Sequence, residues 1–281
     1  MPDEVKDRTH QYNAEATVVS GSLTLPLPQE IQPHARITLQ NSGGYTSQLA
    51  DNHRLQGILS YRSAYTQVSG NRSDKPGQGW TTLSTSVIEG LNVLEVVTAD
   101  RVVGQIITEH PLDGYVPRIN FLGTHFENLR IAGHPVELDL NLGILTKPEK
   151  DVSYAHDPGL AERIAGQYKH VLSHSDLPED LRKRYNEFSS TQRGAKTVEC
   201  SLVNQASGGY PGRSFGHIID IPDFGKVVLG KLTVTSEDLN PGTQTHKKTT
   251  IKLVMIDLEL GCVTAGSVSL GVDITNGQSN P

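Results

Sequence analysis

Acidic residues and histidines are concentrated between residues 85 and 140, and these residue types support metal or acid–base chemistry. Five of them are candidate metal ligands: Glu109, His110, His125, Glu127 and His134. Imidazole nitrogens and carboxylate oxygens together bind divalent transition metals. One hypothesis is therefore a metal-dependent enzyme with a His/Glu site, and a divalent metal is the one cofactor that the sequence suggests.

The competing interpretation is that these histidines lie on the surface or cap turns. Both Glu109-His110-Pro111 and Gly133-His134-Pro135 have the composition of strand-end turns. The HxH…E pattern of cupin-like barrels is missing. The sequence also lacks GxxxxGK[ST], GxSxG, HExxH, EF-hand motifs and a GxGxxG after a strand, which removes the common nucleotide, hydrolase and calcium sites.

A second set of residues suggests a module that binds a small molecule or carbohydrate. The loops at 69–79 and 205–216 are polar and rich in glycine, and such loops are often functional. Tyrosines at 45, 61, 65 and 115 could stack on a sugar ring, but tyrosine is equally suited to a half-buried strand or a protein interface. The candidate ligand-binding residues are Tyr61, Tyr65, Trp80, Arg213 and His217.

Composition and charge limit the classes of partner and the compartment. The net charge of −6 and the pI of about 6.0 argue against nucleic acid as the main partner. No apolar run approaches the ~18 residues of a membrane span. The first residues lack the apolar core of a secretory signal, so we expect a cytoplasmic protein, with leaderless export as the alternative.

The elements that must position these residues are mainly β-strands. Grouped Val, Ile and Thr, together with 27 glycines and 15 prolines, predict short strands with many turns. The part richest in strand-forming residues, at 85–140, contains an internal sequence repeat, which we call the internal echo. Ile88-Glu89-Gly90-Leu91-Asn92-Val93 matches Phe126-Glu127-Asn128-Leu129-Arg130-Ile131, which predicts two equivalent strands of a duplicated β unit.

A helical hairpin interrupts the β pattern at about 157–190. Asp157 before Pro158 is a helix start signal, and it predicts a helix over 158–172, followed by a second helix over 178–188. The expected layout is an N-terminal polar arm (1–14), β block one (15–146), the helical insert (147–193), β block two (194–275) and a polar tail (276–281). The second block could also complete one continuous core with the first.

Two strands of the last block change the phase of their apolar residues. The change falls at Gly230 in one strand and between Leu253 and Ile256 in another. A one-residue phase change predicts a β-bulge, which bends a strand at a barrel or sandwich corner. The fold class that follows is mainly β, with an antiparallel sandwich or barrel-like core.

Cys200 and Cys262 both fall in predicted strands, either as buried thiols or as a pair.

Four runs of the sequence resemble a group of uncharacterised bacterial proteins, and the resemblance covers nearly the whole chain. The runs are EGLNVLEVVTADRVVGQIITEHPLDGYVP, FLGTHFENLRIAGHPVELDL, GHIIDIPDFGKVVLGKL and LGCVTAGSVSLGVDITNG. The pairing of the TADxVVxQ strand with the later NLxIxGxPV strand also resembles secreted bacterial choice-of-anchor β proteins. This resemblance implies a bacterial all-β protein and brings no catalytic residues.

The leading functional hypothesis is a non-catalytic structural or interaction protein. It would self-associate, through β surfaces and through the polar arms at its two ends, into a homo-oligomer or a larger assembly. The many strands and the lack of a catalytic motif favour this hypothesis over the binding module and the metal enzyme.

Overall fold

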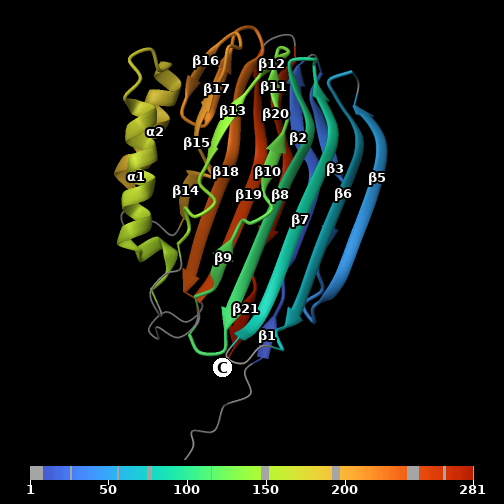
Figure 1. The fold of residues 1–281 in the computed structure, drawn as a ribbon, viewed down its shortest axis with the longest axis vertical. Coiled ribbons are helices and arrows are strands. Elements are labelled where there is room, and N and C mark those ends of the chain that lie inside the picture. The colour runs from blue at the N-terminus through green and yellow to red at the C-terminus, as the bar shows by residue number, and fades with distance from the viewer. Residues whose placement is uncertain are drawn as a thin grey trace, which may run out of the picture.

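Two antiparallel β-sheets packed face to face form the body of the protein (Figure 1). The structure is a computed structural model, and it describes residues 9–25, 27–55, 57–74, 78–114, 116–146, 152–191, 197–238, 247–261 and 264–280. Within these residues both sheets end in edge strands, so the fold is a mainly β sandwich, and of the two architectures expected the barrel-like one is not formed.

The first sheet is built from four long strands in simple up-and-down order. These are β5 (Gly44–Leu55), β6 (Leu59–Arg72), β7 (Gln78–Val93) and β8 (Val97–Pro111). Short strands then pair along the outer side of β8: β9 (Arg118–Asn120), β10 (His125–Glu127) and β11 (Arg130–Ile131), with β12 (His134–Pro135) beyond β11. One interrupted segment therefore forms this edge of the sheet.

The second sheet combines strands from both ends of the chain. Its order is β16 (Arg213–Phe215), β17 (Ile218–Ile221), β18 (Gly225–Asp238), β19 (Lys247–Gly261), β20 (Ala265–Thr275), β2 (Ala14–Leu25) and β3 (Gln29–His34). In addition, β14 (Thr197–Ser201) pairs with β18 and β4 (Ile37–Thr38) pairs with β2. Strands of the expected first block, β2 to β4, thus complete the sheet of the expected second block.

Two further strand pairs lie outside the main sheets. β1 (Thr9–Gln11) pairs with β21 (Gln278–Asn280), so the described part of the N-terminal arm is bound to the C-terminal tail of the same chain. β13 (Glu137–Leu140) pairs with β15 (Val203–Ser207). One hydrophobic cluster then spans both sheets and the helices, from Val18 on β2 to Leu270 on β20.

The predicted helical hairpin is confirmed. A 3₁₀ turn (Tyr154–His156) leads into α1 (Pro158–Leu172), and α2 (Glu179–Thr191) follows. The Asp157 carboxylate caps α1 by accepting from the Gly159 and Leu160 N–H groups, each at 3.1 Å. The hairpin packs beside β14 and β18 at the left of Figure 1, at the side of the sandwich farthest from β5.

The predicted β-bulges at Gly230 and near Met255 are not formed. The pairing of β18 with β19 keeps one register on both sides of these residues, with Leu229 opposite Ile256 and Lys231 opposite Val254. The phase change has another cause: Gly230 has φ of +59°, a left-handed conformation that reverses the alternation of side chains without adding a residue. Sequence periodicity detects the reversal but does not distinguish the two causes.

None of the described helices is long and apolar enough to cross a membrane.

Candidate functional site at the open edge of the sandwich

Most sheet edges among the described residues are short, interrupted by proline or covered. β3 contains Pro33 and is followed by Ala35 with φ of +49°, and β12 is a two-residue strand ending in Pro135. β16 has three residues, and β14 lies against α1, whose Tyr168 hydroxyl donates to the Glu199 carbonyl. Such features prevent a foreign strand from pairing with a sheet edge.

β5 differs from all of these edges. It is twelve residues long, contains no proline, and pairs with β6 along one side only. No described strand pairs with its other side, so β5 forms the free right-hand border of the sandwich in Figure 1. From Gly44 to Ala50 it carries no charged residue. A long, uncharged and unpaired edge is a template for pairing with another strand.

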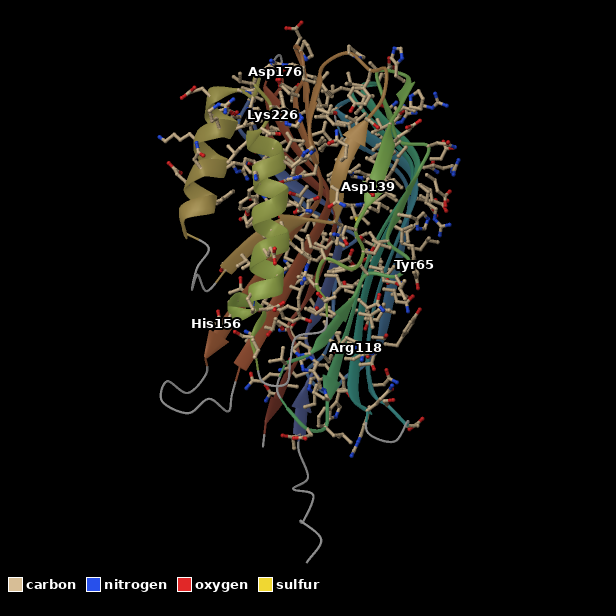
Figure 2. The ribbon with its side chains drawn as sticks, turned by 60° about the vertical axis from the view of Figure 1, so that its left-hand side comes forward. Tyr65, Arg118, Asp139, His156, Asp176 and Lys226 are labelled. Atoms are coloured by element: carbon tan, nitrogen blue, oxygen red, sulfur yellow. The ribbon has the colours of Figure 1, made fainter. Side chains whose placement is uncertain are left out.

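The outer face of β5 carries an exposed apolar pair. Tyr45 and Leu49 are 62% and 66% exposed and lie on the same face, four residues apart. Tyr65 on β6 lies opposite Leu49, and its hydroxyl is 3.0 Å from that of Tyr45. Figure 2 shows Tyr65 on the side of the molecule away from the helical hairpin. We refer to Tyr45, Leu49 and Tyr65 as the edge cluster.

The inner face of the same edge carries a cluster of aromatic rings that fills the gap between the two sheets. His34 of β3 stacks on His53 of β5 with ring centroids 4.0 Å apart, and the Tyr61 hydroxyl of β6 hydrogen-bonds to His34 Nδ1. Burial and the nearby Asp51 raise the pKa of Tyr61 to about 12, and burial with His53 lowers the pKa of His34. This cluster closes the sandwich from inside and leaves the backbone of β5 open.

The five candidate metal ligands do not converge. His125 and Glu127 lie opposite Val103 and Arg101 on β8, whereas Glu109 lies at the far end of β8, opposite Arg118. His134 pairs with Ile131 on the outermost strand. Among the described residues no group of three or more His, Cys, Asp or Glu side chains is arranged to hold a metal ion. The strand β8 is long, and its length separates residues that the sequence places close together.

Three of these candidate ligands, His125, Glu127 and Glu109, have ordinary partners on the surface. His125 Nε2 is 3.0 Å from Glu127 Oε1, and Glu127 also lies 3.9 Å from Arg101. Glu109 lies 3.8 Å from Arg118. Exposed ion pairs of this kind contribute little to stability.

His110 belongs to a buried aromatic group at the end of the sandwich where β1 and β21 lie. Its ring centroid is 4.6 Å from that of His10, which stacks on Trp80 at 5.1 Å. Burial lowers the pKa of His110 to about 3 and that of His10 to about 4, so both imidazoles are neutral at pH 7. Trp80 is 5% exposed with His10 stacked on its ring, and it lines a cavity of about 160 Å³ together with Glu109, His110 and Arg118. Tyr61 is likewise buried, at 3% exposed.

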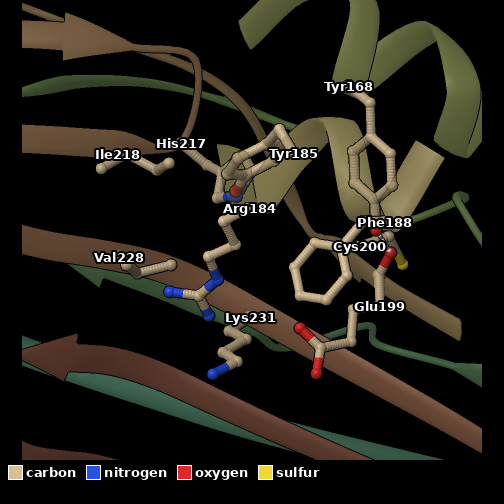
Figure 3. A pocket seen from close by; sticks show the side chains of 10 residues that line it. All are labelled: Tyr168, Arg184, Tyr185, Phe188, Glu199, Cys200, His217, Ile218, Val228 and Lys231. Carbon is tan, nitrogen blue, oxygen red and sulfur yellow. Dashed lines mark hydrogen bonds between the residues drawn. The ribbon is translucent and has the colours of Figure 1, made fainter. Parts of the chain in front are cut away.

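His217 lies in the interface between the helical hairpin and the second sheet (Figure 3). Its Nε2 atom is 2.8 Å from the Tyr185 hydroxyl, and burial with Arg184 and Lys231 lowers its pKa to about 4. The adjoining cavity, between Arg184, Glu199 and Tyr168, measures about 20 Å³, which is room for one water molecule. The geometry is that of a docking contact for the hairpin and leaves no space for a ligand.

The remaining ligand candidates also lie apart. Arg213 is an exposed residue that donates to Asp220 Oδ2 at 2.9 Å and to the Asp176 carbonyl oxygen at 3.0 Å. It lies on β16 at the upper end of Figure 1, whereas β6 ends and β7 begins at the lower end. The described residues of the two loops proposed to bind a ligand together, 69–74 with 78–79 and 205–216, are therefore at opposite ends of the molecule. Tyr115 lies outside the described residues.

Cys200 is a buried free thiol whose pKa is raised to about 12, mainly by burial, which makes it unreactive. Cys262 lies outside the described residues.

Sequence reasoning missed β5 itself, together with His34 and His53. Residues 44–53 show no alternation of apolar and polar residues, because β5 has no fully buried face. The signal available in the sequence is the uncharged, proline-free run Tyr45–Ala50 directly after the turn signal Asn41–Gly44.

The fold and this edge define a class: an antiparallel β-sandwich with a helical hairpin beside one sheet and one open edge strand in the other. The chain belongs to the family described as "Domain of unknown function (DUF8256)", whose model matches residues 10–235. No curated protein and no solved structure matches the chain. The family match fits the resemblance to an uncharacterised group, and a bacterial origin stays a prediction.

Proposed function

We propose that this protein is a non-catalytic interaction protein that self-associates by pairing β5 with β5 of a second copy. The observation that carries the proposal is the contrast between β5 and the other described sheet edges, which are short, contain proline or are covered. The described part of the N-terminal arm pairs within its own chain, so the proposal rests on β5 and not on the arms.

The sequence of β5 is complementary to itself about a two-fold axis at Ser47. Antiparallel pairing about this axis places Tyr45 opposite Leu49 of the second copy, and Leu49 opposite its Tyr45. Two aromatic–aliphatic cross-strand pairs result, each contributing about 0.2–1 kcal/mol beyond the backbone hydrogen bonds. The charged residues of β5, Asp51 and Arg54, lie outside the uncharged stretch that pairs.

The test replaces one member of the edge cluster with a charge. Leu49→Lys places a cation in the centre of the paired edge, where the second copy offers only apolar and uncharged groups, so we expect a monomer. Leu122→Lys is the matched control, because Leu122 is 62% exposed and lies in the turn between β9 and β10, away from β5. Sedimentation equilibrium over a wide concentration range measures the association of both variants and of the parent.

The expected result is a dimer for the parent and for Leu122→Lys, and a monomer for Leu49→Lys. A parent chain that remains monomeric at the highest concentration would overturn the proposal. Equal weakening by both variants would show that association does not use β5.

A further inference from the structure

Among the described residues, a single carboxyl group is buried between the two sheets. Asp273 of β20 is fully buried, and its carboxyl points toward β7 and β8 of the opposite sheet. Ser84 Oγ lies 2.7 Å from Asp273 Oδ1, and Ser86 Oγ lies 2.6 Å from Oδ2. Burial of an acid costs free energy unless hydrogen bonds or loss of charge compensate for it.

The opposite sheet makes room for this carboxyl. A Cβ atom on Gly104 of β8 would lie 2.4 Å from Asp273 Oδ2 and 2.9 Å from Ser86 Oγ. Glycine at this position therefore permits the close approach of Asp273 to β8. The carboxyl is enclosed on all sides by groups of the protein.

Those groups provide no cation. The described residues around Asp273 on the neighbouring strands are Ala16 on β2, Ser84 and Ser86 on β7, Gly104 on β8 and Leu253 on β19, with Met255 of β19 beside Gly104. The nearest acidic residue along β2, Glu15, directs its carboxylate to Arg36 at 2.8 Å. An ionised Asp273 would have only hydroxyl and amide donors to stabilise its charge.

The number of hydrogens on Ser84 decides which group donates. Its Oγ lies 2.8 Å from the Glu15 carbonyl oxygen as well as 2.7 Å from Asp273 Oδ1. A serine hydroxyl carries one hydrogen, and a carbonyl oxygen can only accept. If Ser84 donates to Glu15, the hydrogen between Ser84 and Asp273 has to come from the carboxylic acid.

We propose that Asp273 is a proton-controlled link between the sheets: its neutral acid donates to Ser84, which donates to the Glu15 carbonyl, and this chain joins β20 through β7 to β2. Ionisation removes the first donor. Ser84 then turns its hydrogen to the carboxylate, because a charged acceptor is preferred, and its bond to β2 is broken.

The acid–base behaviour of the group is consistent with this link. Burial raises the pKa of Asp273 to about 7, although the hydrogen bonds from Ser86 and Ser84 oppose the rise. The folded pKa thus exceeds the unfolded value of about 3.9. Between these two values the folded state keeps a proton that the unfolded state loses, so the penalty for burying Asp273 grows as pH rises and is complete above pH 7.

The first test is a direct titration. The ¹³Cγ chemical shift of Asp273 in the full chain, assigned by its disappearance in Asp273→Asn, reports the charge of this one carboxyl. We expect a midpoint near neutral pH. A midpoint at or below the ordinary value for aspartate would overturn the proposal, and this measurement does not depend on the stability of any variant.

The second test compares thermal stability at pH 5 and pH 8. The amide of Asp273→Asn can donate to Ser84 and accept from Ser86, and it carries no charge, so it reproduces the neutral acid at every pH. We expect Asp273→Asn to raise Tm relative to the parent by more at pH 8 than at pH 5. The buried histidines titrate in both proteins and cancel in this difference.

Asp257→Asn is the control for the loss of a carboxylate from the same sheet. Asp257 on β19 accepts from Lys231 at 3.1 Å and from Ser269 at 2.8 Å, so its replacement removes an ion pair and should lower Tm at both pH values. An Asp273→Asn variant that changes Tm equally at pH 5 and pH 8 would show that no proton is involved in the link.

Discussion

Glu89 and Glu127 lie opposite the same residue, Arg101, on the two strands that flank β8. Arg101 is 4.0 Å from Glu89 and 3.9 Å from Glu127. The two acids are 38 residues apart in the sequence, and each belongs to one copy of the internal echo. The echo therefore has a physical basis, because both copies pair with the same residues of β8 in the same register.

The structure extends this repeat to β5. Asn52 follows Asp51 as Gly90 follows Glu89 and Asn128 follows Glu127, again at an interval of 38 residues. The three residues Asn52, Gly90 and Asn128 have φ of +50°, +64° and +49°. Glycine and asparagine are the residues that tolerate this left-handed conformation best. Alternate strands of the first sheet are thus kinked at equivalent positions.

The kink gives a prediction with an internal control. Gly90→Ala introduces a side chain into a left-handed conformation, which costs about 1–2 kcal/mol of folding free energy. Gly90→Asn adds the same Cβ, 3.0 Å from Arg62 Cβ, but installs the residue that the other two copies use. We expect Gly90→Asn to lose less stability than Gly90→Ala, as measured by denaturant unfolding. Equal losses would mean that contact with Arg62, and not backbone conformation, sets the cost.

A cysteine at Ser47 should report the proposed two-fold axis. Residues directly opposite each other in an antiparallel pair have Cα atoms about 4.5–5.5 Å apart, which is within the range of a disulfide. We expect Ser47→Cys, in a chain carrying Cys262→Ser, to form a covalent dimer under mild oxidation. Gln48→Cys is the control, since it would face Thr46 of the second copy. Faster cross-linking of Gln48→Cys, read on a non-reducing gel, would place the axis elsewhere.

Burial of His217 predicts a loss of stability in acid. Its pKa of about 4 in the folded protein is below the ordinary 6.5, so the unfolded chain takes up a proton first as pH falls. The stability is complete above about pH 6.5 and declines toward pH 4, by about 2 kcal/mol at pH 5 from this residue. His217→Gln can still accept from Tyr185 and should show a smaller decrease in unfolding free energy between pH 7 and pH 5. An unchanged decrease would show that other groups cause it.

Local signals were sufficient to predict the helices and the fold class. Asp157 and Pro158 start α1 through the cap and the first turn alone, so no distant contact is needed. Alternating apolar residues on β7 and β8 predict strands for the same reason. The pairing of β2 with β20 could not be predicted in the same way, because it joins the two ends of the chain and no local sequence pattern indicates it.

The candidate site was harder to predict because it depends on a strand edge that has no partner among the described residues and on contacts between residues that are far apart in the sequence. Glu109 and His125 are close in sequence, but they lie far apart along β8 because an extended strand rises about 3.3 Å per residue. His34 and His53 meet only because β3 and β5 border the same side of the sandwich. Whether the edge of β5 is unpaired depends on how the whole sheet is assembled. The residues of β5 themselves show no alternation of apolar and polar side chains that would indicate the strand.

The presence of one long open edge among the described residues also limits the size of the proposed assembly. A two-fold pairing of β5 with β5 consumes the open edge of both copies at once. The outward edges that remain, at β3, β12 and β16, are short and contain or adjoin a proline: Pro33, Pro135 and Pro211. Growth by strand addition would therefore stop at two chains, and the protein would form a closed pair and not a fibre.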